Sequence, residues 1–285
     1  MAIRLEVRGL EKTYGKIRAL RIESLEIESK IIAIIGPNGS GKTTFLTIAA
    51  GLSYPSKGHL EINGLIPYKE REKALKEISF LFEKPKLPLP VKVRDVVGLV
   101  RELGDSDGVE QFINVMNMGM LMDRNLYDLS MGEAQLVGLL TALYMKSSVV
   151  ILDEPFAHLD VRRGGILAGI LKDREACIYT THSPWDAESL ADYIIVLDDG
   201  EIRWSGSRSE LYKGNIIEVY IEPGNGLQYI KSEDSGIRLL TCHGYICLVQ
   251  VEDFDSLERL YKRGDINGFK KAGVRKIYAN ALGND

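Results

Sequence analysis

The chain has 285 residues, of which 45% are hydrophobic and 27% charged, a composition typical of soluble globular proteins with a large buried core. Its formal net charge of −4 argues weakly against a nucleic-acid-binding protein, because phosphate backbones attract basic surfaces. The longest apolar runs, near 31–35 and 148–152, are much shorter than the roughly 20 residues of a membrane span. We therefore expect neither a membrane helix nor a signal-peptide core, and the three cysteines favour a reduced intracellular protein.

The first third of the chain predicts strands joined by hairpins. Strands are expected at 3–8, about 17–28, 31–35, 59–62 and 78–82, and a helix from Lys42 to about Ala50. The three prolines of EKPKLPLP, residues 83–90, then break this pattern. Residues 91–146 carry apolar positions at helical spacing and predict a mainly helical segment.

Strands return in the second half, at 148–152, 176–180 and 193–197. Helices between such strands imply parallel βα units, so we expect an α/β fold with a parallel sheet, an N-terminal antiparallel β subdomain and a helical insert. After Gly214 the pattern changes to a strand-rich tail, with strands at 216–222, 227–231, 245–251 and near 274–279, and a helix at about 256–263. We expect a domain at 1–214, with the insert at about 84–147, and a small α+β domain at 215–285.

A phosphate-binding loop follows the strand at 31–35. It has the pattern G-x-x-x-x-G-K-T between a strand and a helix, which is the context that this motif requires. Glycines let backbone N–H groups turn toward phosphate oxygens, Lys42 reaches the β and γ phosphates, and the Thr43 hydroxyl is a hard ligand for Mg²⁺. The predicted nucleotide-binding residues here are Gly36, Asn38, Gly39, Ser40, Gly41, Lys42, Thr43 and Thr44.

Two carboxylates end the apolar strand at 149–152. Because an acid at the end of a parallel strand lies at the same sheet edge as the phosphate loop, Asp153 suits Mg²⁺, held through a water. Glu154 suits the water that attacks the γ-phosphate, which it can orient or deprotonate. His182 follows another strand, and we expect it to donate a hydrogen bond to the γ-phosphate or to hold Glu154 in place.

The stretch LSMGE at 129–133 is the least obvious feature of the sequence. Its S-x-x-E pattern fits a capping box at a helix start, and that interpretation explains Ser130 and Glu133 in part. It does not explain the order of the motifs, in which a phosphate loop, this stretch and a D-E strand follow one another. In this order the chain resembles the ATP-binding cassette (ABC) ATPases, whose signature is usually written L-S-G-G-Q.

The resemblance covers residues 1 to about 213. It includes Tyr14 in KTYG as the adenine-stacking aromatic, AHLD at 157–160 as the D-loop, and the segment around His182. It implies a P-loop NTPase core that binds and hydrolyses ATP with Mg²⁺. It also implies that two cassettes meet head to tail, so that each signature binds the γ-phosphate of ATP held by the opposite subunit. Ser130, Gly132, Glu133 and Asp160 join the nucleotide-binding residues on this ground.

The chain departs from the family pattern at two places. The signature has Met131 for a glycine and Glu133 for a glutamine, which brings a negative charge near phosphate. Glu83 occupies the position of the glutamine that contacts Mg²⁺ and the attacking water in the family. A carboxylate can bind the metal but cannot donate a hydrogen bond when ionised, so Glu83 joins Thr43 and Asp153 as predicted metal residues.

The leading hypothesis is the ATP-hydrolysing motor subunit of an ABC transporter. We expect its partners to be a second cassette, identical or paralogous, and separate integral membrane permease subunits docked at about 84–104, without direct nucleic-acid contact. Such a chain is cytoplasmic and peripheral on the inner face of the cell membrane, and the absence of an obvious regulatory domain leans slightly toward export. Either Leu87, Leu89, Val91 and Val93 face the permease, or they seal the insert against the core.

Two alternatives come from other classes of protein. A soluble ABC ATPase acting on nucleic acid or ribosomes would carry long coiled coils or two cassettes, and neither is evident here. A stand-alone P-loop kinase would not need LSMGE or a D-loop. The transported cargo is not encoded in this chain, because the permease subunits form the transport path.

Overall fold

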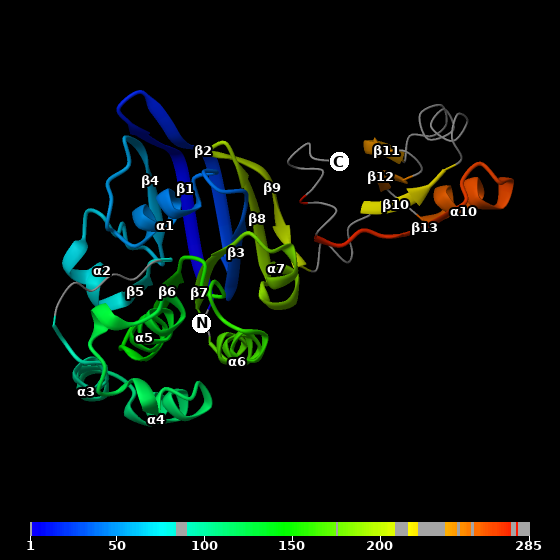
Figure 1. Cartoon of the computed structure of the whole chain (residues 1–285). Helices are drawn as coiled ribbons and strands as arrows, with labels where there is room; N and C mark the ends of the chain where they lie inside the picture. The colour runs from blue at the N-terminus through cyan, green and yellow to red at the C-terminus, as the bar shows by residue number, and fades with distance from the viewer. Residues whose placement is uncertain are drawn as a thin grey trace.

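The computed structural model describes residues 2–83, 90–174, 176–208, 216–221, 237–243, 246–251, 254–274 and 278. A mixed sheet forms the centre of the fold (Figure 1), and its described strands have the order β5-β6-β7-β3-β8-β9. All neighbours run parallel except β8 and β9, which form an antiparallel pair. The strands are β3 (Ile31–Ile35), β5 (Ile78–Leu81), β6 (Val149–Leu152), β7 (Cys177–Thr181), β8 (Tyr193–Asp198) and β9 (Glu201–Ser207).

An antiparallel sheet of β1 (Ile3–Tyr14), β2 (Ile17–Ser29) and β4 (Lys57–Ile62) lies against one face of the central sheet, with α1 (Lys42–Ala49) between them. Side chains alternate between the faces of a strand, and β3 shows this clearly. Ile32 and Ile34 pack toward the antiparallel sheet, whereas Ile31, Ala33 and Ile35 pack into the core on the helical face. Both faces of β3 are therefore buried, which explains its uninterrupted apolar sequence.

Helices cover the other face of the sheet and form the insert between β5 and β6. The helical core buries apolar side chains from the insert helices, the sheet and the two later helices together. The helices between β4 and β8 are α2 (Arg71–Glu77), α3 (Val93–Leu103), α4 (Ser106–Val115), α5 (Met131–Tyr144), α6 (Val161–Lys172) and α7 (Pro184–Leu190), with 3-10 turns at Gly119–Leu121 and Leu126–Asp128. No helix in these described ranges is long and apolar enough to cross a membrane.

The tail forms an antiparallel sheet with its own small core, and the described strands have the order β11-β12-β10-β13. Its elements are β10 (Ile216–Tyr220), β11 (Ile237–His243), β12 (Ile246–Val251), α10 (Phe254–Arg263) and β13 (Gly268–Lys271). The end of the tail returns to the first part of the chain. Val274 is 1% exposed and belongs to the helical core together with Ala187 and Leu190 of α7.

Two expectations about the strands of the tail need correction or comment. The final strand lies at Gly268–Lys271 and pairs with β10, whereas Val274 and Tyr278 are helical, so the strand expected near 274–279 is wrong. The local pattern missed β13 because two lysines and a glycine dilute its apolar character. The strand expected at 227–231 lies outside the described residues.

The cysteines also differ from the expectation of a wholly reduced chain. Cys177 of β7 is free and fully buried, and burial raises the pKa of its thiol to about 12. Cys247 of β12, which lies opposite Cys242 of β11 in the strand register, is disulfide-bonded. The number of cysteines in a sequence does not by itself show which of them are bonded.

Candidate functional site

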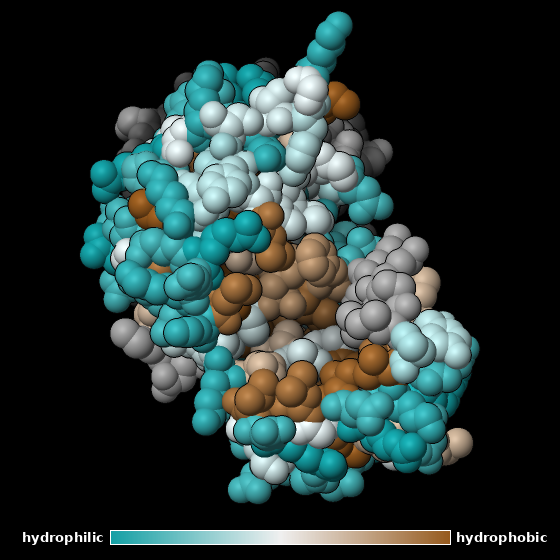
Figure 2. Space-filling model, turned by 90° about the vertical axis from the view of Figure 1, so that its left-hand side faces the viewer, coloured by the Kyte–Doolittle hydropathy of each residue, from teal (hydrophilic) through white to brown (hydrophobic). Residues whose placement is uncertain are grey.

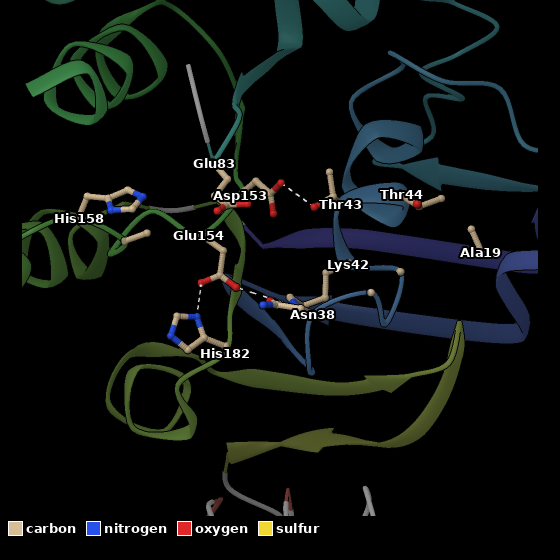
Figure 3. A pocket seen from close by; sticks show the side chains of 13 residues that line it. Ala19, Asn38, Lys42, Thr43, Thr44, Glu83, Asp153, Glu154, His158 and His182 are labelled. Atoms are coloured by element: carbon tan, nitrogen blue, oxygen red, sulfur yellow. Dashed lines mark hydrogen bonds and ion pairs between the residues drawn. The ribbon is translucent and has the colours of Figure 1, made fainter. Parts of the chain in front are cut away.

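The carboxyl ends of four parallel strands meet at one edge of the central sheet, as expected for an α/β fold. Lys42 and Thr43 begin α1, directly after the loop that follows β3, and Glu83 follows β5. Asp153 and Glu154 follow β6, and His182 follows β7. The sequence-predicted phosphate, metal and catalytic side chains therefore come from separate segments and converge at this edge (Figure 3).

The phosphate loop has the backbone that its glycines permit. Gly41 has φ 100°, and a Cβ at this position would lie 2.6 Å from the carbonyl oxygen of Ala19, so a larger residue does not fit. Lys42 is 6% exposed, and its Nζ donates to the carbonyl oxygens of Gly36 at 2.9 Å and Pro37 at 3.0 Å. Burial lowers the pKa of Lys42, while the nearby Glu154 and Asp153 oppose that shift.

Thr43 and Asp153 form an oxygen pair next to the loop. The Thr43 Oγ1 hydroxyl donates to Asp153 Oδ2 at 2.8 Å. The other carboxylate oxygen of Asp153 accepts from Thr180 Oγ1 at 2.7 Å, and the same hydroxyl accepts from the Glu154 N–H at 2.8 Å. Thr180 thus fixes both acids, a role that the sequence analysis missed because a threonine inside a strand gives no local signal.

Glu154 occupies a constrained position between two cationic or polar partners. Its φ is 49°, which is unusual for a residue with a side chain and is found at functional sites. Its Oε1 lies 4.0 Å from Lys42 Nζ, and its Oε2 lies 3.1 Å from His182 Nδ1. Burial raises the pKa of Glu154, and His182 and Lys42 counteract part of that shift. A raised pKa suits a group that takes a proton during the reaction.

These side chains line a cavity of about 690 Å³. The cavity brings together most of the predicted residues and adds three that were not among the predicted site residues, namely Ala19, Ala157 and His158. His158 also has a positive φ of 62°. It belongs to the AHLD stretch, and that motif was the sequence feature from which its place at the site could have been predicted. The predicted residues on its wall are Asn38, Gly39, Gly41, Lys42, Thr43, Thr44, Glu83, Asp153, Glu154 and His182.

The signature lies outside this cavity wall. Ser130 is the N-cap of α5: its Oγ accepts from the Glu133 N–H at 3.3 Å, and Glu133 Oε2 accepts from the Ser130 N–H at 2.8 Å. The capping box inferred from the sequence is confirmed. A Cβ at Gly132 would lie 2.8 Å from the carbonyl oxygen of His158, so the D-loop backbone passes closely over this glycine. Met131, at the family's glycine position, is 49% exposed and fits without a clash.

Tyr14 and Asp160 also lie apart from the cavity wall. Tyr14 is 51% exposed, and Lys12 Nζ lies 4.9 Å from the centroid of its ring. Asp160 is the N-cap of α6, and its Oδ1 accepts from the Arg163 N–H at 2.9 Å. The residues that the family resemblance assigns to nucleotide binding thus fall into two groups, one lining the cavity and one on other surfaces of the same chain.

The comparisons with known proteins agree with this geometry. Residues 23–157 match the family model described as ABC transporter. The chain is 30% identical to the sulfate/thiosulfate import ATP-binding protein CysA of Pseudomonas putida over 96% of this chain and 83% of that protein. It is also 30% identical to the protein of the same name from Rhodopseudomonas palustris, over 73% of this chain and 64% of the relative.

The chain belongs to the ABC transporter family. Solved structures agree in fold. An ATP-binding subunit of an ABC transporter superposes with a TM-score of 0.64 at 22% identity, over 74% of this chain and 92% of that one. A dimeric ATP-binding cassette in a post-hydrolysis state bound to ADP and Pi has a TM-score of 0.60 at 23% identity, over 72% of this chain and 98% of that one.

Family membership confirms the function inferred from the motifs. The protein is the ATP-binding and ATP-hydrolysing motor subunit of an ABC transporter, and ATP and Mg²⁺ are its ligands. The two alternatives, a soluble ATPase acting on ribosomes or nucleic acid and a stand-alone kinase, are not favoured.

Proposed function

We propose that two copies of this cassette, or one copy and a paralogue, close head to tail around two ATP molecules, and that each site needs residues of both chains. One observation carries the proposal. The cavity holds the phosphate loop, both strand-end acids and His182, whereas the signature lies outside its wall with Ser130 exposed at the start of α5. A helix start with an exposed hydroxyl suits an anion brought by another molecule.

Within one site, each side chain has a role that its surroundings support. Lys42 exchanges its carbonyl partners for the β and γ phosphates, because a nearly buried ammonium gains most from a new anionic partner. Glu154 orients or deprotonates the attacking water, and its raised pKa supports that task. His182, 69% exposed and 3.1 Å from Glu154, holds that carboxylate and faces the open side of the cavity.

The residues also fit Mg²⁺. The Thr43 hydroxyl and Asp153 present hard oxygens that already lie 2.8 Å apart, and Glu83 lines the same cavity. The described residues contain no group of three His, Cys, Asp or Glu side chains that would bind a metal by themselves. Mg²⁺ needs no such group, since it usually keeps several waters and takes further oxygens from substrate phosphates. When bound, the ion would neutralise phosphate charge.

Two further roles rest on the family resemblance. We assign adenine stacking to Tyr14, whose ring is half exposed at the end of β1. We assign Asp160 to the contact between the two cassettes, because it caps α6 directly after the His158 segment that lines the cavity. The neighbouring Val161 is 96% exposed, which supports an interface on this surface.

Domain organisation and the permease dock form a separate proposal. We divide the chain at residues 1–214 and 215–285, with the helical subdomain at about 84–147, and the separate core of the tail sheet supports this division. Figure 2 views the side that carries α2 and α3 and shows apolar atoms lining a hollow between two polar lobes. The exposed apolar side chains of α2 and α3 include Leu75, Leu99 and Leu103, and the exposed Phe82 directly follows β5.

The sequence-based dock at 84–104 needs one correction. Val93 is fully buried and Val91 packs against the helical core, so these two valines seal the insert and do not face a permease. Leu87 and Leu89 lie outside the described residues. We therefore place the dock on the exposed side chains of Leu75, Phe82 and Leu99.

The direction of transport is proposed to be import, in place of the slight lean toward export. The support is that the relatives matched along the chain are named import ATP-binding proteins. Membrane permease subunits of the importer would select the cargo. The chain itself would lie at the inner face of the cell membrane, bound to those subunits.

Mixing two defective chains tests the composite site. Lys42→Ala breaks the phosphate loop and keeps the signature. Ser130→Asp keeps a side-chain acceptor at the N-cap, but its negative charge repels the γ-phosphate. Each homodimer then has a defect in both sites, whereas a mixed dimer regains one intact site. ATPase activity that appears only on mixing supports the proposal, and an active Ser130→Asp chain on its own would refute it.

A further inference from the structure

Arg124 contacts the signature at Glu133, one of the residues where this chain departs from the family pattern. Its Nη1 lies 2.7 Å from Glu133 Oε1, and its Nη2 donates to the carbonyl oxygen of Asp128. The main chain of Arg124 is held as well, because its N–H donates to Leu121 and its carbonyl accepts from Val93. The guanidinium therefore reaches Glu133 from a fixed base in the helical insert.

Glu133 needs a cationic partner because its carboxylate stays ionised. A glutamine at this position would be neutral, but the Glu133 carboxylate accepts from the Ser130 N–H and lies beside a guanidinium. The hydrogen bond to the Ser130 backbone and the charge of Arg124 hold the pKa of Glu133 below its usual range. Protonation thus does not remove the negative charge from a surface that has to approach a triphosphate.

We infer that Arg124 is a positioning residue that neutralises Glu133 and so lets a signature with glutamate accept the γ-phosphate of ATP bound to the opposite cassette. The inference rests on the proposed head-to-tail dimer. The two oxygens of Glu133 then have separate tasks: Oε2 caps the helix start and Oε1 takes the compensating charge. The Ser130 hydroxyl accepts from the Glu133 N–H, which leaves its own proton for a phosphate oxygen.

Fold stability alone does not account for the pair. The Arg124 side chain is 41% exposed and the Glu133 side chain 26%, and ion pairs with this much solvent contribute little to folding. We expect the pair to matter when the γ-phosphate of the opposite cassette approaches Glu133, because like charges in a desolvating interface repel strongly.

The experiment is a double-mutant cycle in the Glu154→Gln background, which slows hydrolysis. The measured quantity is the ATP concentration at half-maximal dimer formation, followed by analytical ultracentrifugation. Arg124→Gln is expected to raise that concentration about tenfold or more, which corresponds to the removal of one compensating charge. Glu133→Gln is expected to match the parent or to need less ATP. The double variant is expected to return to within about twofold of Glu133→Gln, since no charge remains to neutralise.

Arg94→Gln is the matched control, because Arg94 pairs with Asp123 at 2.6 Å in the same insert and does not contact the signature. It is expected to dimerise like the parent. Arg124→Lys keeps the charge and should stay within a few-fold of the parent, which separates charge from folding defects. A double variant as impaired as Arg124→Gln would overturn the inference while leaving the dimer intact. A parent chain that stays monomeric at saturating ATP would overturn the dimer proposal and this inference together.

Discussion

The Gln135 side chain joins the signature helix to the main chain of Glu154. Gln135 is fully buried in α5, and its Nε2 donates to the carbonyl oxygens of Glu154 at 3.3 Å and Pro155 at 3.2 Å. Because Glu154 has a positive φ, its backbone conformation needs such external support. The helix that begins with the proposed signature contacts thus supports, one turn later, the main chain of the residue proposed to act on the attacking water.

Replacing Gln135 by methionine, which has a similar shape, should weaken both stability and hydrolysis. Two buried carbonyl groups lose a donor, and each such loss costs about 1–3 kcal/mol. Release of the Glu154 backbone should lower the rate of ATP hydrolysis about tenfold or more, because misplacement of a catalytic group is costly. Urea unfolding and steady-state ATPase measurements test the two effects.

Thr141→Val on the same helix is the control for Gln135. The Thr141 hydroxyl donates only to the carbonyl of Val137, four residues earlier, so its loss should leave ATP hydrolysis unchanged. An unchanged rate in Gln135→Met would show that Glu154 keeps its position without the amide.

The pH dependence of stability should report on the buried Glu154 carboxyl. Its ordinary pKa is 4.5, and burial raises the pKa in the folded chain. The folded state therefore holds the proton more tightly than the unfolded state, so the contribution of Glu154 to stability declines as pH rises from 4.5 through the folded-state pKa. Above the folded-state pKa, ionisation of Glu154 lowers the free energy of unfolding by a constant amount.

Glu154→Gln removes this titration. Its free energy of unfolding, relative to the parent chain, should increase as pH rises through the folded-state pKa and then level off. Urea titrations of both proteins between about pH 4 and 8 measure the difference. A difference that is constant across this range would contradict the raised pKa.

Glu83→Gln should change the Mg²⁺ requirement. A glutamine contributes a weaker oxygen ligand than a carboxylate, so the Mg²⁺ concentration for half-maximal ATPase activity should rise several-fold. Glu72→Gln, at an exposed position of α2, is the control and should leave it unchanged. An unchanged Mg²⁺ profile in Glu83→Gln would show that Glu83 does not contribute to the metal site.

Charged substitutions on the proposed dock should separate docking from catalysis. Leu75 is 74% exposed on α2 and Leu99 is 53% exposed on α3, so aspartate at either position should fold normally. Each variant should keep its ATPase activity but lose most of the membrane protein that co-purifies with the parent from detergent-solubilised native membranes. Met120→Asp, at an 87% exposed position outside 84–104, serves as the control. Equal recovery of the membrane protein with all three variants would place the dock elsewhere.

The sequence predicted the parts of the site that local patterns encode. The phosphate loop, the strand-end acids and the capping box depend on residues that are close in the chain, and all three were found at the expected places. Thr180 and Gln135 escaped prediction because they act on residues 26 and 19 positions away, through contacts that only the folded sheet creates. The same reason explains the missed partner of Glu133, since Arg124 lies nine residues upstream in an irregular segment.

The tail strands were harder to predict than those of the central sheet. Strand β3 is buried on both faces, and its sequence is therefore a continuous apolar run that is easily recognised. Strands β11 and β13 mix apolar and charged residues, and their identity depends on the partners they pair with across the tail.

The return of the chain end to α7 limits where this protein can be shortened. A Cβ added at Gly273 would lie 3.3 Å from Glu188 Oε1, and Val274 shares a core with Ala187 and Leu190. A fragment that stops at residue 214 would thus expose apolar side chains of α7, the helix that begins two residues after His182. Such a fragment would not reproduce the behaviour of the intact cassette, because the exposed apolar surface would favour self-association beside the loop that carries His182.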